Sequence, residues 1–133
     1  MIDPIAKMRA CLIADTTISE MVGNRIWGGH TEPPESAKYQ PSDGGAIAFT
    51  TVGGVGNYGH NFVSPRYQIR CFHTDEVQAM VLYRAVFDRL FINGGGCDCM
   101  RSDLESGPIS IHMAETDWPH VLAFFKSTFR AVG

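Results

Sequence analysis

Residues 64–92, SPRYQIRCFHTDEVQAMVLYRAVFDRLFI, decide the fold of this chain. The first part of the stretch alternates residue by residue, as a pleated strand does. Tyr67, Ile69 and Cys71 fall on one side. Arg66, Gln68, Arg70 and Phe72 fall on the other. We therefore expect a strand with one apolar face and one largely polar face.

The second part of the stretch changes to helical spacing. Thr74 is expected to cap the helix, and Asp75 and Glu76 place negative charge in its first turn. A broad apolar stripe follows, made of Ala79, Leu82, Tyr83, Val86, Phe87, Leu90 and Phe91. The run Asn93-Gly94-Gly95-Gly96 should end the helix. Such a strand and helix together predict a sheet with the helix packed on it.

The segments before this stretch predict two helices and a strand. Asp3 to Ala14 reads as a first helix, with Pro4 at its first turn and Ile5, Met8, Leu12 and Ile13 on one apolar face. Cys11 lies near that face and is expected to be a small core residue. Thr17 to Glu20 reads as a capping box that opens a short second helix, and Gly23 ends it. Arg25 to Trp27 is expected to be a brief strand.

The remaining strands predict the fold class. They are expected at Ala46–Val52, Asp98–Leu104, Pro108–Met113 and His120–Ala131, with a turn at Gly107-Pro108. The order of elements predicts an α+β fold. Its antiparallel or mixed sheet has about four to five strands, with two main helices packed on one face. We expect a single domain over residues 1–133.

Composition narrows the class of function. The chain has 133 residues, of which 44% are hydrophobic and 19% charged, so a globular protein is expected. Its formal charge of −3 argues against general nucleic-acid binding, which needs a basic surface. No apolar run suits a membrane helix, and the start lacks a leader pattern. A cytoplasmic protein with reduced cysteines is the expectation.

Two loops are the candidate contact segments. The first, Gly28 to Gly45, is rich in Gly, Pro, Ser and Glu, and long loops of this kind are often functional. The second, Gly53 to Asn61, is glycine-rich and is expected to be the flexible tip of a hairpin. Because a strand follows it rather than a helix, it is not a phosphate-binding loop. The candidate partner-contact residues are Trp27, Tyr39, Asn57, Tyr58, Arg66, Arg70 and Trp118.

The sequence offers two alternatives to a contact surface, a zinc site and a catalytic site. Cys97 and Cys99 could bind zinc with a histidine, but their spacing is wrong for a usual zinc site, so no metal is expected. An enzyme would need His73, His112 or His120 within hydrogen-bond reach of a nucleophile in a pocket. The sequence supplies no such pairing, so neither catalytic residues nor a cofactor are predicted.

The whole chain resembles the tail completion and tail terminator proteins of long-tailed bacteriophages. The resemblance lies in the run Ile18–Trp27 after a first helix that ends at Ala14-Asp15. It continues in the strand Ala46–Phe49 after a proline-bearing loop, and in the strand Tyr67–Phe72 with the helix Asp75–Phe91. It ends where the terminal strand begins, near Trp118-Pro119-His120. The tip at residues 53–61 is longer than the family pattern.

The resemblance implies a non-enzymatic structural virion protein. Such proteins form a ring, commonly a hexamer, at the head-proximal end of the tail tube. The ring ends tube polymerisation and joins the tail to the head connector, and genomic DNA passes through its lumen. The expected partners are therefore further copies of the chain, the tube protein and connector proteins. The expected location is the neck of the virion, with assembly in the host cytoplasm.

Overall fold

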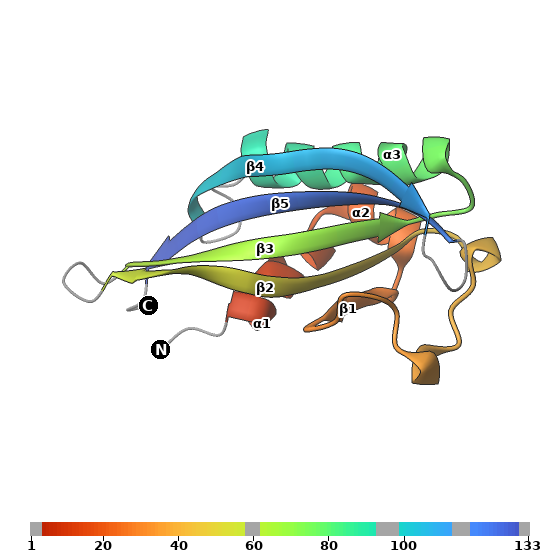
Figure 1. The fold of residues 1–133 in the computed structure, drawn as a ribbon, viewed down its shortest axis with the longest axis horizontal. Coiled ribbons are helices and arrows are strands. Elements are labelled where there is room, and N and C mark those ends of the chain that lie inside the picture. Colours follow the sequence, from red (N-terminus) through yellow and green to blue (C-terminus); the bar gives the residue numbers. More distant parts are fainter. Residues whose placement is uncertain (1–3, 58–61, 93–98, 113–117, 131–133) are drawn as a thin grey trace.

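The fold is a single mixed sheet covered by helices on one face. A computed structural model describes residues 4–57, 62–92, 99–112 and 118–130 (Figure 1). The strands are β1 (Ile26–Gly28), β2 (Ala46–Asn57), β3 (Phe62–Phe72), β4 (Cys99–His112) and β5 (Pro119–Arg130). They lie in the order β1-β2-β3-β5-β4. Only β1 and β2 are parallel among these neighbours, which confirms the α+β class with a mixed sheet.

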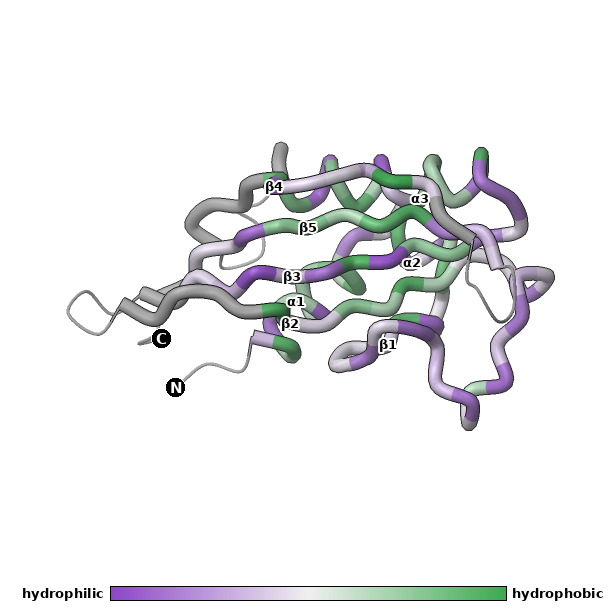
Figure 2. Tube along the Cα trace, in the orientation of Figure 1, coloured by the Kyte–Doolittle hydropathy of each residue, from purple (hydrophilic) through white to green (hydrophobic). Residues whose placement is uncertain are grey.

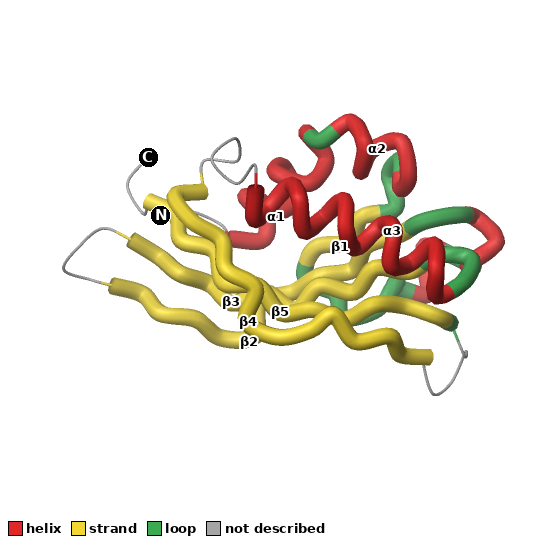
Figure 3. Tube along the Cα trace, turned by 90° about the horizontal axis from the view of Figure 1, so that it is seen from above, coloured by secondary structure: helices red, strands yellow, loops and turns green. Residues whose placement is uncertain are grey.

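The helices form one layer. They are α1 (Pro4–Ala14), α2 (Thr16–Val22) and α3 (Glu76–Phe87), and the π-helical turn η3 (Asp88–Ile92) extends α3. Viewed along the sheet, all three helices lie on the same side of the strands (Figure 3). The predicted packing of helices on one face is confirmed. No helix in the described ranges is long and apolar enough to cross a bilayer.

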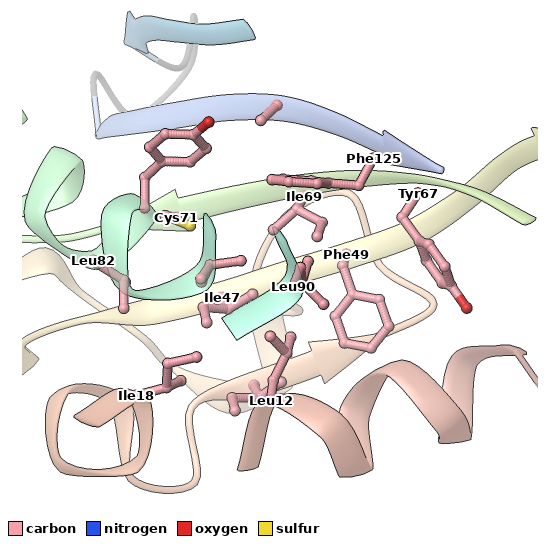
Figure 4. Packing of buried hydrophobic residues seen from close by; sticks show 14 of the residues in the cluster. Leu12, Ile18, Ile47, Phe49, Tyr67, Ile69, Cys71, Leu82, Leu90 and Phe125 are labelled. Carbon is pink, nitrogen blue, oxygen red and sulfur yellow. The ribbon is translucent and has the colours of Figure 1, made fainter. Parts of the chain in front are cut away.

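The core lies between this layer and the sheet. The alternation predicted for β3 is confirmed, because Tyr67, Ile69 and Cys71 all point toward the helices and are buried. The predicted stripe of α3 meets them through Ala79, Leu82, Tyr83, Val86 and Leu90. Figure 4 shows Leu12 and Ile18 closing the same core from α1 and α2. Ile13, expected on the inner face of α1, is instead 39% exposed.

Both predicted helix caps are off by one or two residues. The N-cap of α2 is Asp15, whose carboxylate accepts a 3.1 Å hydrogen bond from the Ile18 amide. The N-cap of α3 is Asp75, whose carboxylate accepts at 2.8 Å from the Gln78 amide. Aspartate caps a helix as well as threonine does, so both candidates were available at each helix start. The sequence prediction chose Thr17 and Thr74, and both choices are wrong.

Two strands are longer than the sequence predicted. β2 continues through the glycine-rich run to Asn57, where a flexible tip was expected, and it pairs with β3 as far as Phe62. Residues 58–61 lie outside the described part. β4 is one strand from Cys99 to His112, and Gly107-Pro108 lies inside it instead of forming a turn. Gly107 has a φ of 97°, and a Cβ there would lie 2.7 Å from the Leu122 carbonyl oxygen. Glycine suits both the angle and the close approach.

Candidate interaction surface

The face of the sheet opposite the helices carries the candidate site. The side chains that point away from the helices at the middle of β3 and β5 are half-buried, namely Arg66, Gln68, Arg70, Leu122, Phe124 and Lys126; Phe72 and His120 at the end of this face are buried. Because facing residues of paired strands share a sheet face, Ile109 on β4 joins Leu122 on β5 there. We call this set the open face, and it consists of Arg66, Gln68, Arg70, Ile109, Leu122, Phe124 and Lys126. Figure 2 shows polar positions along β3 next to apolar ones along β5.

Arg66 lies on β3 at the end of the open face away from the aromatic residues Phe72 and His120. Its guanidinium carbon is 4.6 Å from the centroid of the Phe124 ring, a cation–π contact. Its Nε is 3.3 Å from the Glu105 carboxylate, but its N–H is not aligned with any acceptor among the described residues. Both side chains of this ion pair are more than a third exposed, so it adds little stability. Lys126 lies directly opposite Arg66 on β5, and two cations in that position repel each other.

Arg70 is held by two neighbours. With its amide oriented to satisfy both groups, the Gln68 oxygen accepts from Arg70 Nε at 3.0 Å and from Nη2 at 3.1 Å. Arg70 Nη1 lies 3.4 Å from Nε2 of His120, and Nδ1 of His120 lies 3.3 Å from the Trp118 carbonyl oxygen. A carbonyl only accepts, so Nδ1 carries the ring proton and Nε2 is free to accept from Arg70. The open face is therefore ordered before any partner arrives.

Three of the predicted contact residues meet in an aromatic cluster at one end of the open face. Tyr39, from the loop between β1 and β2, lies with its ring centroid 5.7 Å from that of Trp27 and 5.4 Å from that of Trp118. Phe72 completes the cluster beneath it, 6.3 Å from Tyr39. Tyr39 is only 5% exposed, so it packs inside the molecule and is not the exposed aromatic anchor that the sequence suggested. Trp27 and Trp118 stay half-buried.

The cluster fixes the loop that supplies Tyr39. The loop contains two short 3-10 turns, η1 (Glu35–Ala37) and η2 (Pro41–Asp43). The Tyr39 hydroxyl donates to the Gly44 carbonyl oxygen at 2.7 Å, and Arg25 Nε donates to the Gly45 carbonyl oxygen at 2.8 Å. Burial raises the pKa of Tyr39 to about 12, against the opposing effect of the Arg25 charge. The predicted long loop is thus anchored at Tyr39 and at its last residues, Gly44 and Gly45.

The other four predicted contact residues lie in different parts of the chain. Arg66 and Arg70 both lie on the open face of β3, with the outward-pointing Gln68 between them. Asn57 ends β2 opposite Phe62. Tyr58 lies outside the described residues. Sequence reasoning missed the direct pairing of Phe72 with His120, which joins the aromatic cluster to the arginines. The alternation of β5 contained the signal, but only the register of β3 on β5 reveals the pair.

The sheet has unpaired strand edges next to the open face. β1 pairs only with Ile47 to Phe49, so in the described part of the chain the outer edge of β2 has no partner strand from Thr50 to Asn57. β4 forms the opposite edge. Its pairing with β5 is interrupted by three register shifts, and Pro108 cannot donate a backbone hydrogen bond. Such features protect an edge against unwanted strand pairing, so the β2 edge is the more open of the two.

The histidines and cysteines do not form a reactive centre within the described residues. His73 follows β3, where its Nδ1 accepts a 2.8 Å hydrogen bond from the Thr74 amide. Burial lowers the pKa of His73; the Asp75 charge opposes this shift and the Arg25 charge adds to it. His120 is buried in contact with Phe72. No group of three metal-binding side chains occurs in the described ranges. Cys97 and the side chains of Cys99 and His112 lie outside them.

One cysteine differs from the expectation of reduced thiols. Cys11 is buried in the core, as predicted, but it is disulfide-bonded. Cys71 is a free cysteine in the middle of the core, and burial raises the pKa of its thiol to about 12. A thiol that is buried and protonated is a poor nucleophile. Cys71 therefore acts as a packing residue.

Comparison with known proteins leaves the family of this chain open. No protein-family model matches the sequence, and no curated protein matches it either.

Proposed function

We propose that the chain is a structural virion protein that forms a ring at the head-proximal end of a phage tail tube. In this role it ends tube polymerisation and joins the tail to the head connector. The proposal starts from the resemblance in the order of elements. The structural observation that supports it best is the one-sided cover of the sheet.

A sheet covered on one face leaves apolar surface to be buried by a partner. Ile109 is 45% exposed on the open face, and Leu122 and Phe124 beside it are only half-buried. Apolar side chains grouped on an ordered strand surface, with cations around them, are a typical composition for a protein interface. In an assembly, a neighbouring subunit would bury these apolar side chains.

Ring formation requires two different surfaces on each copy. A contact between unlike patches repeats from copy to copy and closes if the rotation between copies allows it. The described part of the chain has unlike candidate patches, namely the open face, the β2 edge from Thr50 to Asn57 and the loop anchored by Tyr39. The further partners are then the tube protein on one side of the ring and connector proteins on the other. The net charge of −3 per chain suits a ring through which DNA slides without binding.

A tube-elongation assay tests this function. Purified chain is added to polymerising tube protein, and tube lengths and tube ends are measured by negative-stain electron microscopy. The proposal predicts that mean tube length falls as the chain is added and that a ring-shaped cap is seen at one end only. Heat-denatured chain is the control. Unchanged tube lengths with bare ends at saturating chain would overturn the proposal.

A further inference from the structure

The open face carries excess positive charge. By register this face carries Arg66, Arg70 and Lys126, with Arg101 opposite Thr128 and Asp103 opposite Lys126 on β4, and Glu105 is adjacent. Four cations and two anions leave a net charge of +2. This excess occurs in a chain whose total formal charge is −3. Lys126 has no ion pair with another described residue, and Arg66 reaches only Glu105. The open face is therefore suited to a negatively charged partner surface.

The loop from residue 29 to residue 45 carries the opposite excess. We call it the acidic loop. It contains three anionic residues, Glu32, Glu35 and Asp43, and one cationic residue, Lys38, so its net charge is −2. All four side chains are exposed. Glu32 and Glu35 have no ion pair with another described residue. Tyr39, Arg25 and the capping box of Gln40 and Asp43 hold the loop in place, so its charges are presented in a fixed position.

The acidic loop adjoins one end of the open face through Tyr39, but Glu32 and Glu35 form no ion pair with Arg66, Arg70 or Lys126 within one molecule. Figure 1 shows η1 standing away from the sheet, beside β1, whereas the open face lies over β3 and β5. Figure 3 shows no helix on that side of the strands. Two rigid surfaces of opposite charge on different parts of one chain can pair only between copies. Such pairing joins unlike patches, as a ring requires.

We propose that the acidic loop of one copy docks on the open face of the next, with Glu32 and Glu35 set against Arg66, Arg70 and Lys126. This contact rests on the proposed ring and names the surfaces that build it. The carboxylates of the incoming loop relieve the repulsion between the facing Arg66 and Lys126. In the docked pair, the exposed Ala37 of the incoming loop packs on Leu122 and Phe124 of the next copy. Charge sets the orientation of the two copies, and apolar burial supplies affinity.

Two charge-reversal variants test the contact. Arg66→Glu with Lys126→Glu turns the open face from +2 to −2, by four units of charge. Glu32→Lys with Glu35→Lys turns the acidic loop from −2 to +2 by the same four units. Each variant alone now sets like charges against each other. We expect each to need a concentration at least about 100-fold higher than the original chain for assembly, as measured by sedimentation velocity.

Mixing the two variants gives the sharpest result. The unchanged acidic loop of the face variant meets the unchanged open face of the loop variant, and the two reversed surfaces also attract each other. An equimolar mixture should therefore assemble, with the variants alternating and an even number of copies in each ring. Carrying all four substitutions in one chain should restore assembly as well. Native mass spectrometry identifies the copy number and the alternation.

Matched controls separate this contact from general charge effects. Arg9→Glu with Arg84→Glu makes the same change in net charge as the face variant, on exposed positions of α1 and α3. Glu20→Lys with Glu76→Lys does so for the loop variant, on α2 and α3. Both controls should assemble like the original chain. Circular dichroism and thermal melting show that every variant is folded before assembly is measured.

The outcomes distinguish this contact from the proposed function. If the original chain forms a ring, alone or on tubes, and folded face and loop variants form it equally well, the contact is wrong and the ring stands. Failure of the mixture and of the four-substitution chain to regain assembly would also overturn the contact. If the original chain forms no ring even on tubes, the proposed function itself fails.

Discussion

The hydroxyl of Tyr39 donates a 2.7 Å hydrogen bond to the carbonyl oxygen of Gly44, five residues further along the same loop. The Tyr39 ring is buried against Trp27, Phe72 and Trp118 at the same time. A surface loop is thus tied into a small second core on the open side of the sheet. Tyr39 therefore anchors the acidic loop together with Arg25 and the capping box of Gln40 and Asp43.

Replacing Tyr39 by Phe should remove the hydrogen bond and keep the ring. We expect a loss of about 1 kcal/mol in the free energy of unfolding, the usual net contribution of such a bond. The measurement is chemical denaturation at neutral pH. Equal stability of the two chains, or a loss as large as a missing ring would cause, would contradict the assigned hydrogen bond. Tyr83→Phe is the matched control within the helix-side core.

Tyr39 should also make the fold sensitive to alkali. Its pKa is about 12 in the folded chain and ordinarily 10.0, so the protonated phenol favours the folded state. That stability is complete below pH 10 and is lost as pH rises from 10 toward 12. We expect Tyr39→Phe to flatten this part of the stability profile. If both chains lose the same stability between pH 10 and pH 12, groups other than Tyr39 cause that loss.

The two aspartate caps predict a paired result. Asp15→Ala and Asp75→Ala should each lower the free energy of unfolding by about 1 kcal/mol, because each leaves a helix amide without its acceptor. Thr17→Ala and Thr74→Ala, at the positions that sequence patterns favour, should change it much less. Thermal and urea denaturation of the four variants measure both. Larger losses at the threonines than at the aspartates would refute the cap assignment.

His73 predicts a weak acid sensitivity. Because its folded pKa is lower than the ordinary 6.5, protonation favours the unfolded chain. The stability contributed by neutral His73 is present above pH 6.5 and falls as pH drops through the unfolded value toward the folded one. His73→Asn should reduce this loss between about pH 7 and pH 5 relative to the original chain, as measured by urea midpoints. A steeper loss in the variant would show that the sign is wrong.

The cysteines predict a simple count. One disulfide consumes two of the four cysteines, so a thiol reagent in denaturant without reductant should find two thiols, and four after reduction. In the native chain Cys71 should stay unmodified, because its thiol is buried and its pKa is about 12. Peptide mapping after alkylation identifies the labelled sites. Four thiols in the unreduced denatured chain would mean that Cys11 is not bonded.

The sequence predicted the central elements because each has a strong period of its own. β3 alternates from Arg66 to Cys71, and the stripe of α3 repeats over three turns. Each pattern depends only on which face of the strand or helix packs against the core. The alternation of β5 sets Val121, Ala123 and Phe125 on the face opposite Leu122 and Phe124, and the structure buries the first three on the helix side.

Other elements could not be predicted because they depend on long-range pairing. Gly107-Pro108 has the composition of a turn, but β5 runs past it without a break and keeps β4 in one strand. The run from Gly53 to Asn57 has weak strand propensity, yet β3 offers it a continuous partner. In each case a neighbouring strand overrides the local preference.

Four of the seven predicted contact residues lie at the candidate surface, but the sequence did not predict the apolar residues beside them or how they are arranged. Arginine and aromatic enrichment pointed to Arg66, Arg70, Trp27 and Trp118, and all of these lie on the outer side of the sheet or at its end. Tyr39 is buried because its loop folds back onto Trp27, Phe72 and Trp118. The connection of the aromatic cluster to Arg70 through Phe72 and His120 depends on the register of β3 with β5.

The mass of the purified chain in solution, with and without tube protein, tests the central claim most directly. Multi-angle light scattering on a size-exclusion column measures it. A closed ring of about six copies, or a monomer that becomes such a ring on tubes, is the result we predict from closure of a contact between unlike patches. A dimer of fixed mass that ignores tubes would contradict the proposed ring and favour a different function.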